Sequence, residues 1–169
     1  MKMAKTNTFL ILIPCLIFLS VSHGQEAESD LPSPRMRCPE GSIFYGSHCY
    51  YYNYLDQLTW ADADIYCQSF ESGHLVSVLN QSEGNFVASL INDSGVRNSF
   101  IWIGFYDPKK NRRWHWSNSS PVTYKAWASG SPNNNNPGYC AVLASNEGYK
   151  KWKDLSCEQT YSFVCKFKG

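Results

Sequence analysis

The chain has 169 residues and a formal net charge of +1, with 15 basic and 14 acidic side chains. A balance this close to neutral excludes the strongly basic surface typical of nucleic-acid-binding proteins, so no nucleic acid is expected as a partner. Aromatic residues make up 15% of the sequence. The length and this composition predict one domain with a modest, aromatic-rich core.

Residues 1–24 have the pattern of a secretory signal peptide. Two lysines precede an apolar run, 9–21, and small residues lead up to Gly24. The run is too short to span a membrane, so we expect cleavage between Gly24 and Gln25, a secreted extracellular product and no membrane insertion. Cleavage removes Cys15 and leaves six cysteines, which predicts a disulfide framework. Six cysteines allow many pairings, and their spacing alone does not choose among them.

Residues 25–37 contain acidic residues and prolines but almost nothing apolar to bury, which predicts an unstructured acidic leader. Arg35 and Met36 form a bond that a trypsin-like protease can cut on a flexible segment. A protease-sensitive leader is therefore expected, and a passive disordered terminus is the alternative.

The expected domain, 38–169, begins with a hairpin. Turn residues separate two aromatic segments around Cys38 and Cys49, which indicates a hairpin closed by its own disulfide. Later segments have the apolar or aromatic pattern of short strands: 75–79, 100–105, 114–116, 141–143 and 161–165.

Two helices are predicted from apolar periodicity and from residues that cap helix N-termini. Thr59 and Asp62 approximate a capping box that opens the first helix. Asp62 and Asp64 are expected on the exposed side of this helix. Asn80 and Glu83 open the second helix.

Residues 117–139 lack periodicity and are rich in Ser, Asn, Pro and Gly. A run of this length without secondary structure is usually functional in a compact domain. Side-chain amides supply both donors and acceptors, which suits sugar hydroxyls. Turn chemistry on a solvated loop is the alternative. Together with Asp154, the candidate glycan-binding residues in this run are Ser131, Asn133, Asn134, Asn135 and Asn136.

A dense basic turn precedes Trp114 and Trp116. Cations next to aromatic rings can bind sulfated or phosphorylated glycans by charge and stacking. The alternative is a surface hairpin with solvating charges. The four basic residues are Lys109, Lys110, Arg112 and Arg113.

Three N-glycosylation sequons occur, and Asn118, in the irregular run, is the expected acceptor. The histidines after the signal peptide, His48, His74 and His115, lack metal-ligand spacing and accompany no nucleophile motif. We therefore expect no enzymatic activity, no cofactor and no metal.

The order of these features resembles the C-type lectin-like domain over 38–169: two helices, a Trp-Ile-Gly strand, a long polar loop and a Trp-x-Asp-x-x-Cys motif. The chain is most similar to the regenerating (Reg) family, the lithostathine or pancreatic stone protein group. The similarity lies in segments 25–27, 38–41, 107–116 and 163–168. It implies a single α+β domain of two helices with antiparallel sheets. It also implies three disulfides, Cys38–Cys49, Cys67–Cys165 and Cys140–Cys157.

Calcium-dependent lectins of this fold hold Ca²⁺ through a Glu-Pro-Asn motif in the long loop and an Asn-Asp pair after the Trp. The corresponding positions here are Ser131-Pro132-Asn133 and Lys153-Asp154. Calcium takes about six to eight oxygen ligands, several of them carboxylates. Because only Asn133 and Asp154 keep suitable groups, and Lys153 brings an ammonium, calcium-dependent sugar binding is not expected.

The resemblance implies secretion by pancreas or gut epithelium, with alternative functions. One is calcium-free, antimicrobial-type binding to peptidoglycan or mannan on bacterial or epithelial surfaces. Another is growth promotion of epithelial or islet cells through a cell-surface receptor. A calcium-dependent lectin and a pancreatic-juice inhibitor of calcium carbonate crystal growth are further alternatives. The family also implies trypsin trimming between Arg35 and Met36, followed by greater self-association.

Overall fold

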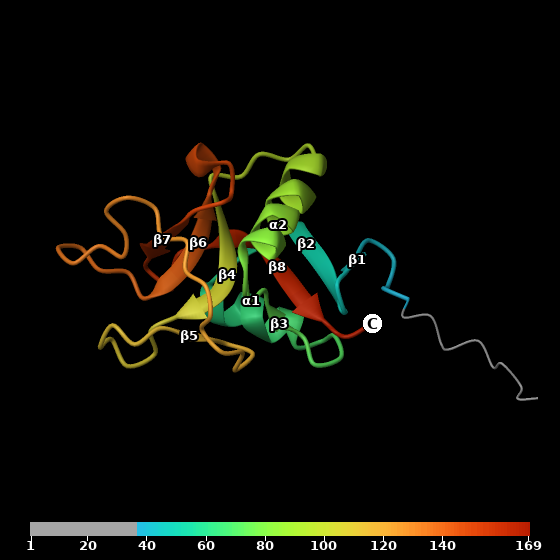
Figure 1. The fold of residues 1–169 in the computed structure, drawn as a ribbon, viewed down its shortest axis with the longest axis horizontal. Helices are drawn as coiled ribbons and strands as arrows, with labels where there is room; N and C mark the ends of the chain where they lie inside the picture. The colour runs from blue at the N-terminus through green and yellow to red at the C-terminus, as the bar shows by residue number, and fades with distance from the viewer. Residues whose placement is uncertain (1–36) are drawn as a thin grey trace, which may run out of the picture. The chain divides into compact units, whose positions relative to one another are not determined.

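The computed structural model describes residues 37–169. The predicted signal peptide and all but the last residue of the predicted leader, with the cleavage positions Gly24–Gln25 and Arg35–Met36, lie outside the described residues. Residues 37–169 form an α+β domain in which two helices pack beside a sheet (Figure 1). None of the helices in 37–169 has the length and apolar character needed to cross a membrane.

The sheet has eight strands in the order β1-β2-β8-β4-β6-β7, with β3 paired to β8 and β5 paired to β4. A short 3₁₀ turn, Ser145–Glu147, follows β6. The elements in chain order are β1 (Ile43–Tyr45), β2 (His48–Leu58), α1 (Trp60–Cys67), β3 (His74–Leu75), α2 (Gln81–Asp93), β4 (Phe100–Tyr106), β5 (His115–Trp116), β6 (Cys140–Ala144), β7 (Trp152–Leu155) and β8 (Tyr161–Phe167).

The sheet is mixed: most neighbouring strands are antiparallel, as expected, and one pair is parallel. Strands β4 and β8 are parallel, with Ile101 opposite Ser162 and Trp102 opposite Phe163. Parallel pairing needs a long crossover, and the segment between β4 and β8, which contains β5, β6 and β7, supplies it. The predicted strand 75–79 is also shorter than expected, since only His74–Leu75 pairs with β8.

Both helices begin where capping predicted. The Thr59 side chain accepts a hydrogen bond from Asp62 N, and the Asn80 side chain accepts one from Glu83 N. The expected exposure of Asp62 is confirmed, but that of Asp64 was wrong, because Asp64 is only 8% exposed. Helix α1 ends at Cys67, and its last turns lie against β3 and β8.

Three disulfides are present, Cys38–Cys49, Cys67–Cys165 and Cys140–Cys157, with sequence separations of 11, 98 and 17 residues. These are the pairs that the family resemblance implied. Cys67–Cys165 is fully buried and connects α1 to β8. The surrounding core is aromatic, as the composition predicted: Trp102, Trp152, Phe105 and Phe163 are among the largest fully buried side chains.

A buried ion pair connects α2 to β8. Lys166 Nζ lies 2.5 Å from Glu83 Oε1, and each residue is 5% exposed. Glu83 also accepts hydrogen bonds from Tyr50 OH at 2.7 Å and from Leu79 N at 2.8 Å, and Lys166 donates to Ser77. Burial, and then the hydrogen bond to the Glu83 carboxylate, raise the pKa of Tyr50 above its ordinary value. The buried charges of Glu83 and Lys166 are therefore paired with each other and hydrogen-bonded to neighbouring groups of the domain.

The irregular run 117–139 is attached to the sheet near its middle. Trp127 forms an isolated parallel bridge with Trp152 of β7, and Ala126 and Ala128 exchange backbone hydrogen bonds with the same residue. The second half of the run, 129–137, has no strand or helix and extends beyond β6 and β7 (Figure 1).

Candidate functional site

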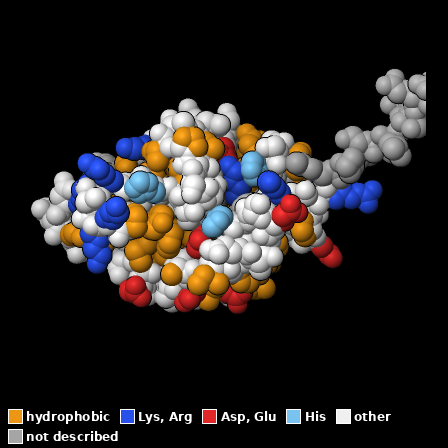
Figure 2. Space-filling model, turned by 90° about the horizontal axis from the view of Figure 1, so that it is seen from below, with side chains coloured by type: hydrophobic (Ala, Val, Ile, Leu, Met, Phe, Trp, Pro, Cys, Tyr) orange, Lys and Arg blue, Asp and Glu red, His pale blue; other side chains and the backbone are white. Residues whose placement is uncertain are grey.

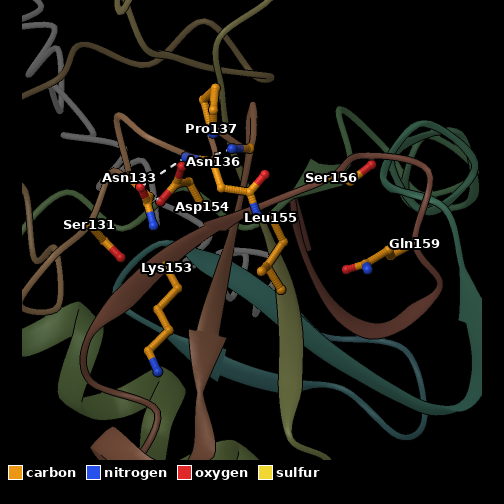
Figure 3. Close-up of a pocket in the computed structure, with 10 residues that line it drawn as sticks. Ser131, Asn133, Asn136, Pro137, Lys153, Asp154, Leu155, Ser156 and Gln159 are labelled. Carbon is orange, nitrogen blue, oxygen red and sulfur yellow. Dashed lines mark hydrogen bonds between the residues drawn. The ribbon is translucent and has the colours of Figure 1, made fainter.

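A polar pocket of about 310 Å³ opens between the long loop and β7 (Figure 3). It brings together four of the predicted residues, whereas Asn134 and Asn135 lie outside its lining. The residues that line it are Ser131, Asn133, Asn136, Pro137, Gly138, Lys153, Asp154, Leu155, Ser156 and Gln159.

Asp154 of β7 anchors the long loop through hydrogen bonds. Its carboxylate is buried, and its two oxygens accept backbone hydrogen bonds from Asn133 N at 2.7 Å and from Gly138 N at 2.9 Å. Gly138 is needed for this approach, since a Cβ at that position would lie 2.3 Å from Leu155 N. Asp154 thus fixes both ends of the segment 133–138 against β7.

The side chain of Asn133 is also used within the loop. Its Oδ1 accepts hydrogen bonds from the backbone N–H groups of Asn135 and Asn136, at 2.9 and 3.1 Å. This is an Asx-type turn, in which the side chain replaces a backbone acceptor. Asn133 therefore fixes the turn of the loop, and this turn places Asn136 in the lining of the pocket.

The donor set does not fit a calcium ion. Calcium needs several carboxylate and carbonyl oxygens that are free to converge on it, but Asn133 Oδ1 and both Asp154 oxygens already accept backbone N–H groups. No group of three or more His, Cys, Asp or Glu residues in 37–169 is arranged to hold a metal. The Lys153 ammonium donates to Asn146 Oδ1 at 3.3 Å.

Replacing Asp154 by alanine is expected to release the loop. The variant loses two hydrogen bonds to a buried charged acceptor, and we expect a loss of about 2 kcal/mol in the free energy of unfolding. Hydrogen exchange at Asn133 N and Gly138 N should accelerate as well. Asp93→Ala, at an exposed position, is the control and should change stability by less than about 0.5 kcal/mol. Unchanged exchange at both amides would contradict this role.

The basic turn lies beside the loop and contacts it. Arg112 Nη2 donates hydrogen bonds to Asn133 O at 2.8 Å and to Asn134 Oδ1 at 2.6 Å. The buried Asp107 carboxylate accepts the backbone N–H groups of Asn111 and Arg112, which holds the turn in shape. Arg112 is therefore a support for the asparagine run, and this link was not predicted.

The binding alternative for the basic turn included stacking of a ligand on Trp114 and Trp116, but both rings are buried. These side chains are 9% and 2% exposed and pack in the core around Phe105. Lys109, Lys110 and Arg113 remain exposed. Figure 2 shows lysine and arginine side chains gathered at the left end of the domain, to which the loop after β4 extends in Figure 1.

A model of the Lectin C-type domain family matches residues 56–167 of the chain. The chain belongs to the C-type lectin domain family. Mouse Lithostathine-1 is 63% identical over 163 residues, which cover 96% of this chain and 98% of the relative. The crystal structure of human lithostathine superimposes with a TM-score of 0.80 at 58% identity, covering 86% of this chain and 100% of that one.

These similarities confirm the resemblance to the lithostathine group of Reg proteins. A further solved structure is a calcium-independent type II antifreeze protein. It has a TM-score of 0.67 at 26% identity and covers 79% of this chain and 95% of that chain.

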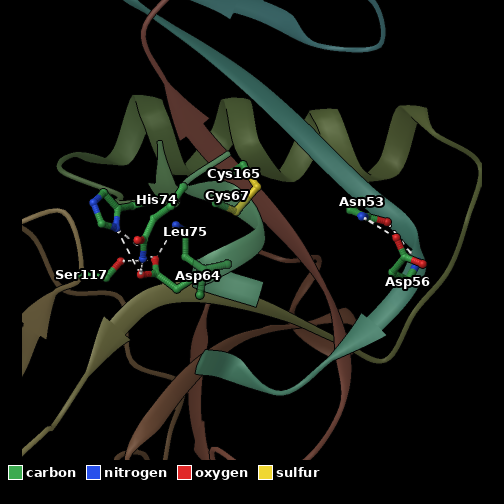
Figure 4. Close-up of a disulfide and its surroundings, with 9 residues drawn as sticks. Asn53, Asp56, Asp64, Cys67, His74, Leu75, Ser117 and Cys165 are labelled. Carbon is green, nitrogen blue, oxygen red and sulfur yellow. Dashed lines mark hydrogen bonds and ion pairs between the residues drawn. A yellow bond between two sulfur atoms is a disulfide. The ribbon is translucent and has the colours of Figure 1, made fainter. Parts of the chain in front are cut away.

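Elsewhere in the lectin domain, Asp64, His74 and Ser117 meet beside the Cys67–Cys165 disulfide (Figure 4). Ser117 Oγ donates to Asp64 Oδ1 at 2.9 Å, and His74 Nδ1 lies 3.1 Å from Asp64 Oδ2. Leu75 N donates to the same carboxylate at 2.9 Å. In a catalytic triad the histidine lies between the other two. Here the carboxylate is the shared partner, so the cluster ties α1 to the loop after β5.

Asn118, the expected glycosylation site, is half-buried. Its Nδ2 donates to Ser77 Oγ at 2.9 Å, and its Oδ1 accepts from Ser120 N at 3.0 Å. Glycosylation at Asn118 stays a prediction, and an attached glycan would have to accommodate the contact with Ser77.

Ser156 and Gln159 were missed as pocket residues. The Cys140–Cys157 disulfide carries their turn to the beginning of β6, next to the end of the long loop. The Cys140–Cys157 pairing, which the family resemblance implied, could therefore have predicted that these residues lie near the loop.

Proposed function

We propose that this C-type lectin domain binds glycans without calcium at the polar pocket of the long loop. The observation that carries this proposal is the position of the Asp154 carboxylate. The carboxylate accepts hydrogen bonds from the backbone N–H groups of Asn133 and Gly138. The loop is thereby held without a cation, and the pocket above it has its shape from the protein alone.

The groups that line the pocket suit sugar hydroxyls. The side chains of Ser131, Ser156 and Asn136 form no side-chain hydrogen bond with other residues in 37–169, so their donors and acceptors face a ligand unpaired. Gln159 adds a second amide, which accepts a hydrogen bond from Tyr161 OH at 2.6 Å. Hydroxyl and amide groups placed around a pocket can fix the orientation of a sugar.

The proposed ligands are peptidoglycan or mannan-type glycans of bacterial or epithelial surfaces, bound by a secreted protein. Three features support secretion and a loop that is independent of calcium. The signal-peptide pattern precedes the domain, all six cysteines of 37–169 are paired, and a protein of the same fold is described as calcium-independent. Disulfides of this number are typical of extracellular proteins.

Retention on insoluble peptidoglycan and on mannan, in calcium and in EDTA, tests the proposal. We expect binding that EDTA leaves unchanged. Asn136→Ala should weaken it about tenfold, because one or two hydrogen bonds to the sugar are lost. Asn135→Ala is the matched control, since Asn135 is also exposed but lies outside the pocket lining.

Loss of binding in EDTA would contradict the calcium-free site. Equal effects of Asn136→Ala and Asn135→Ala would contradict its location. If neither polysaccharide retains the unaltered protein, the glycan function is wrong, and growth promotion through a cell-surface receptor becomes the function to test.

A further inference from the structure

A second pocket, of about 350 Å³, adjoins the polar pocket. The two pockets share the lining residues Pro137 and Ser156, so they are neighbours on the surface near the 156–158 turn. The second pocket differs in character because aromatic rings form much of its wall. Its lining residues are Trp60, Tyr106, Asp107, Pro108, Lys110, Pro137, Tyr139, Cys140, Ser156, Cys157 and Glu158.

The aromatic rings that line this pocket are held in place by contacts with the core. Trp60 and Tyr106 are stacked with their ring centroids 4.4 Å apart, and Trp60 Nε1 donates to Ile103 O at 2.8 Å. Tyr106 and Tyr139 are half-buried. Within 37–169 neither phenol OH forms a hydrogen bond to another residue, which leaves two hydroxyls and two partly accessible rings at the pocket.

The backbone around these rings is rigid. Tyr139 N donates to Leu155 O and Asp107 N donates to Tyr139 O, at 3.2 and 2.8 Å. The Cys140–Cys157 disulfide forms part of the floor. At the rim, Lys110 Nζ lies 5.1 Å from the centroid of the Tyr139 ring. The pocket is therefore formed before any ligand arrives, which lowers the entropic cost of binding.

We infer that this aromatic pocket is a second subsite for the glycan that the polar pocket binds. One sugar residue lies in the polar pocket, and the next places the C–H face of its ring on Tyr139 and Tyr106. Lys110 and the two phenol hydroxyls then meet its hydroxyl groups. The ligand is accordingly a chain of at least two sugar residues. This inference rests on the proposed glycan function and adds the length and the second contact surface of the ligand.

The two pockets would make different contacts with the ligand, and a single sugar residue can occupy only one of them. Hydroxyl and amide groups in the polar pocket fix orientation, and contact with aromatic rings contributes affinity through burial of apolar surface. Because both contacts require one continuous ligand, binding should strengthen from one sugar unit to two or more.

Titration of the isotopically labelled protein followed by NMR tests the subsite. The probes are α-mannose oligomers and β-1,4-linked N-acetylglucosamine oligomers, each from one unit to four. We expect the oligomers of one series to bind more tightly than its monosaccharide and to shift the Tyr106 and Tyr139 amides. Tyr139→Ala should weaken oligomer binding about tenfold and leave monosaccharide binding unchanged.

Two further variants make the result specific. Tyr139→Phe keeps the ring and should retain most of the oligomer affinity. Tyr54→Ala removes a tyrosine that is 42% exposed and lies outside both pockets, and it should change nothing.

Affinity that is independent of chain length, or an oligomer affinity that Tyr139→Ala leaves intact, would overturn the subsite. If Asn136→Ala still weakens binding about tenfold in that case, the proposed function stands without the second subsite. If no oligomer in either series binds the unaltered protein, the subsite and the glycan function are both wrong.

Discussion

Removal of the Cys67–Cys165 disulfide by the double substitution Cys67→Ala and Cys165→Ala is expected to lower the free energy of unfolding by about 4 to 5 kcal/mol. The two cysteines are separated by 98 positions in the sequence. A crosslink of this span removes much of the conformational freedom of the unfolded chain, and the chain-entropy estimate for a loop of about 100 residues is about 4.7 kcal/mol. Chemical denaturation of the folded variant measures the loss.

The matched control is removal of Cys38–Cys49, whose cysteines are separated by only 11 positions. The same estimate gives about 3 kcal/mol for a loop this short. The long-range pair should therefore cost about 2 kcal/mol more than the hairpin pair. Equal losses would show that loop entropy does not govern these disulfides. If the long-range variant fails to fold while the hairpin variant folds, the long-range pair contributes the larger share of the stability.

Glu83→Ala is expected to destabilise the domain by about 3 to 5 kcal/mol. The substitution leaves the Lys166 ammonium buried without its carboxylate, and breaking one side of a buried ion pair costs this much. It also removes the acceptor for Tyr50 OH and Leu79 N. Denaturation with guanidinium chloride, with the slope of the transition compared between variants, measures the change.

Lys168→Ala provides the control, since Lys168 is an exposed lysine two residues from Lys166 and should matter by less than about 0.5 kcal/mol. Replacing both Glu83 and Lys166 by leucine should recover much of the loss, because no buried charge then remains unpaired. A loss below about 1 kcal/mol for Glu83→Ala would mean that the ammonium reaches water in the variant.

Local patterns in the sequence were sufficient for the parts of the fold that depend on near neighbours. The caps at Thr59 and Asn80 each use a residue three positions ahead, and the β1–β2 hairpin closes within a few residues. The parallel pairing of β4 with β8 and the burial of Asp64 depend on chain segments far away. Asp64 is buried because Leu75 N and Ser117 Oγ donate to it, and helical periodicity carries no information about either.

In the candidate site too, the sequence predicted individual residues but not the contacts between distant segments. Asn133 and Asp154 were identified from a motif, and the structure joins them through one hydrogen bond. The contact of Arg112 with the asparagine run, and the meeting of Tyr106 with Tyr139, were not predicted. Each joins segments about 20 or more positions apart whose proximity is set by the sheet and by the Cys140–Cys157 disulfide.

The acceptor that orders the loop, the carboxylate of Asp154, is part of the chain itself. Where a bound ion orders a loop, the loop loses its shape when the ion is diluted or sequestered. A loop ordered by its own carboxylate has no such dependence. The pocket should consequently keep the same form in fluids rich or poor in dissolved minerals, and its occupancy should depend on the abundance of its ligand alone.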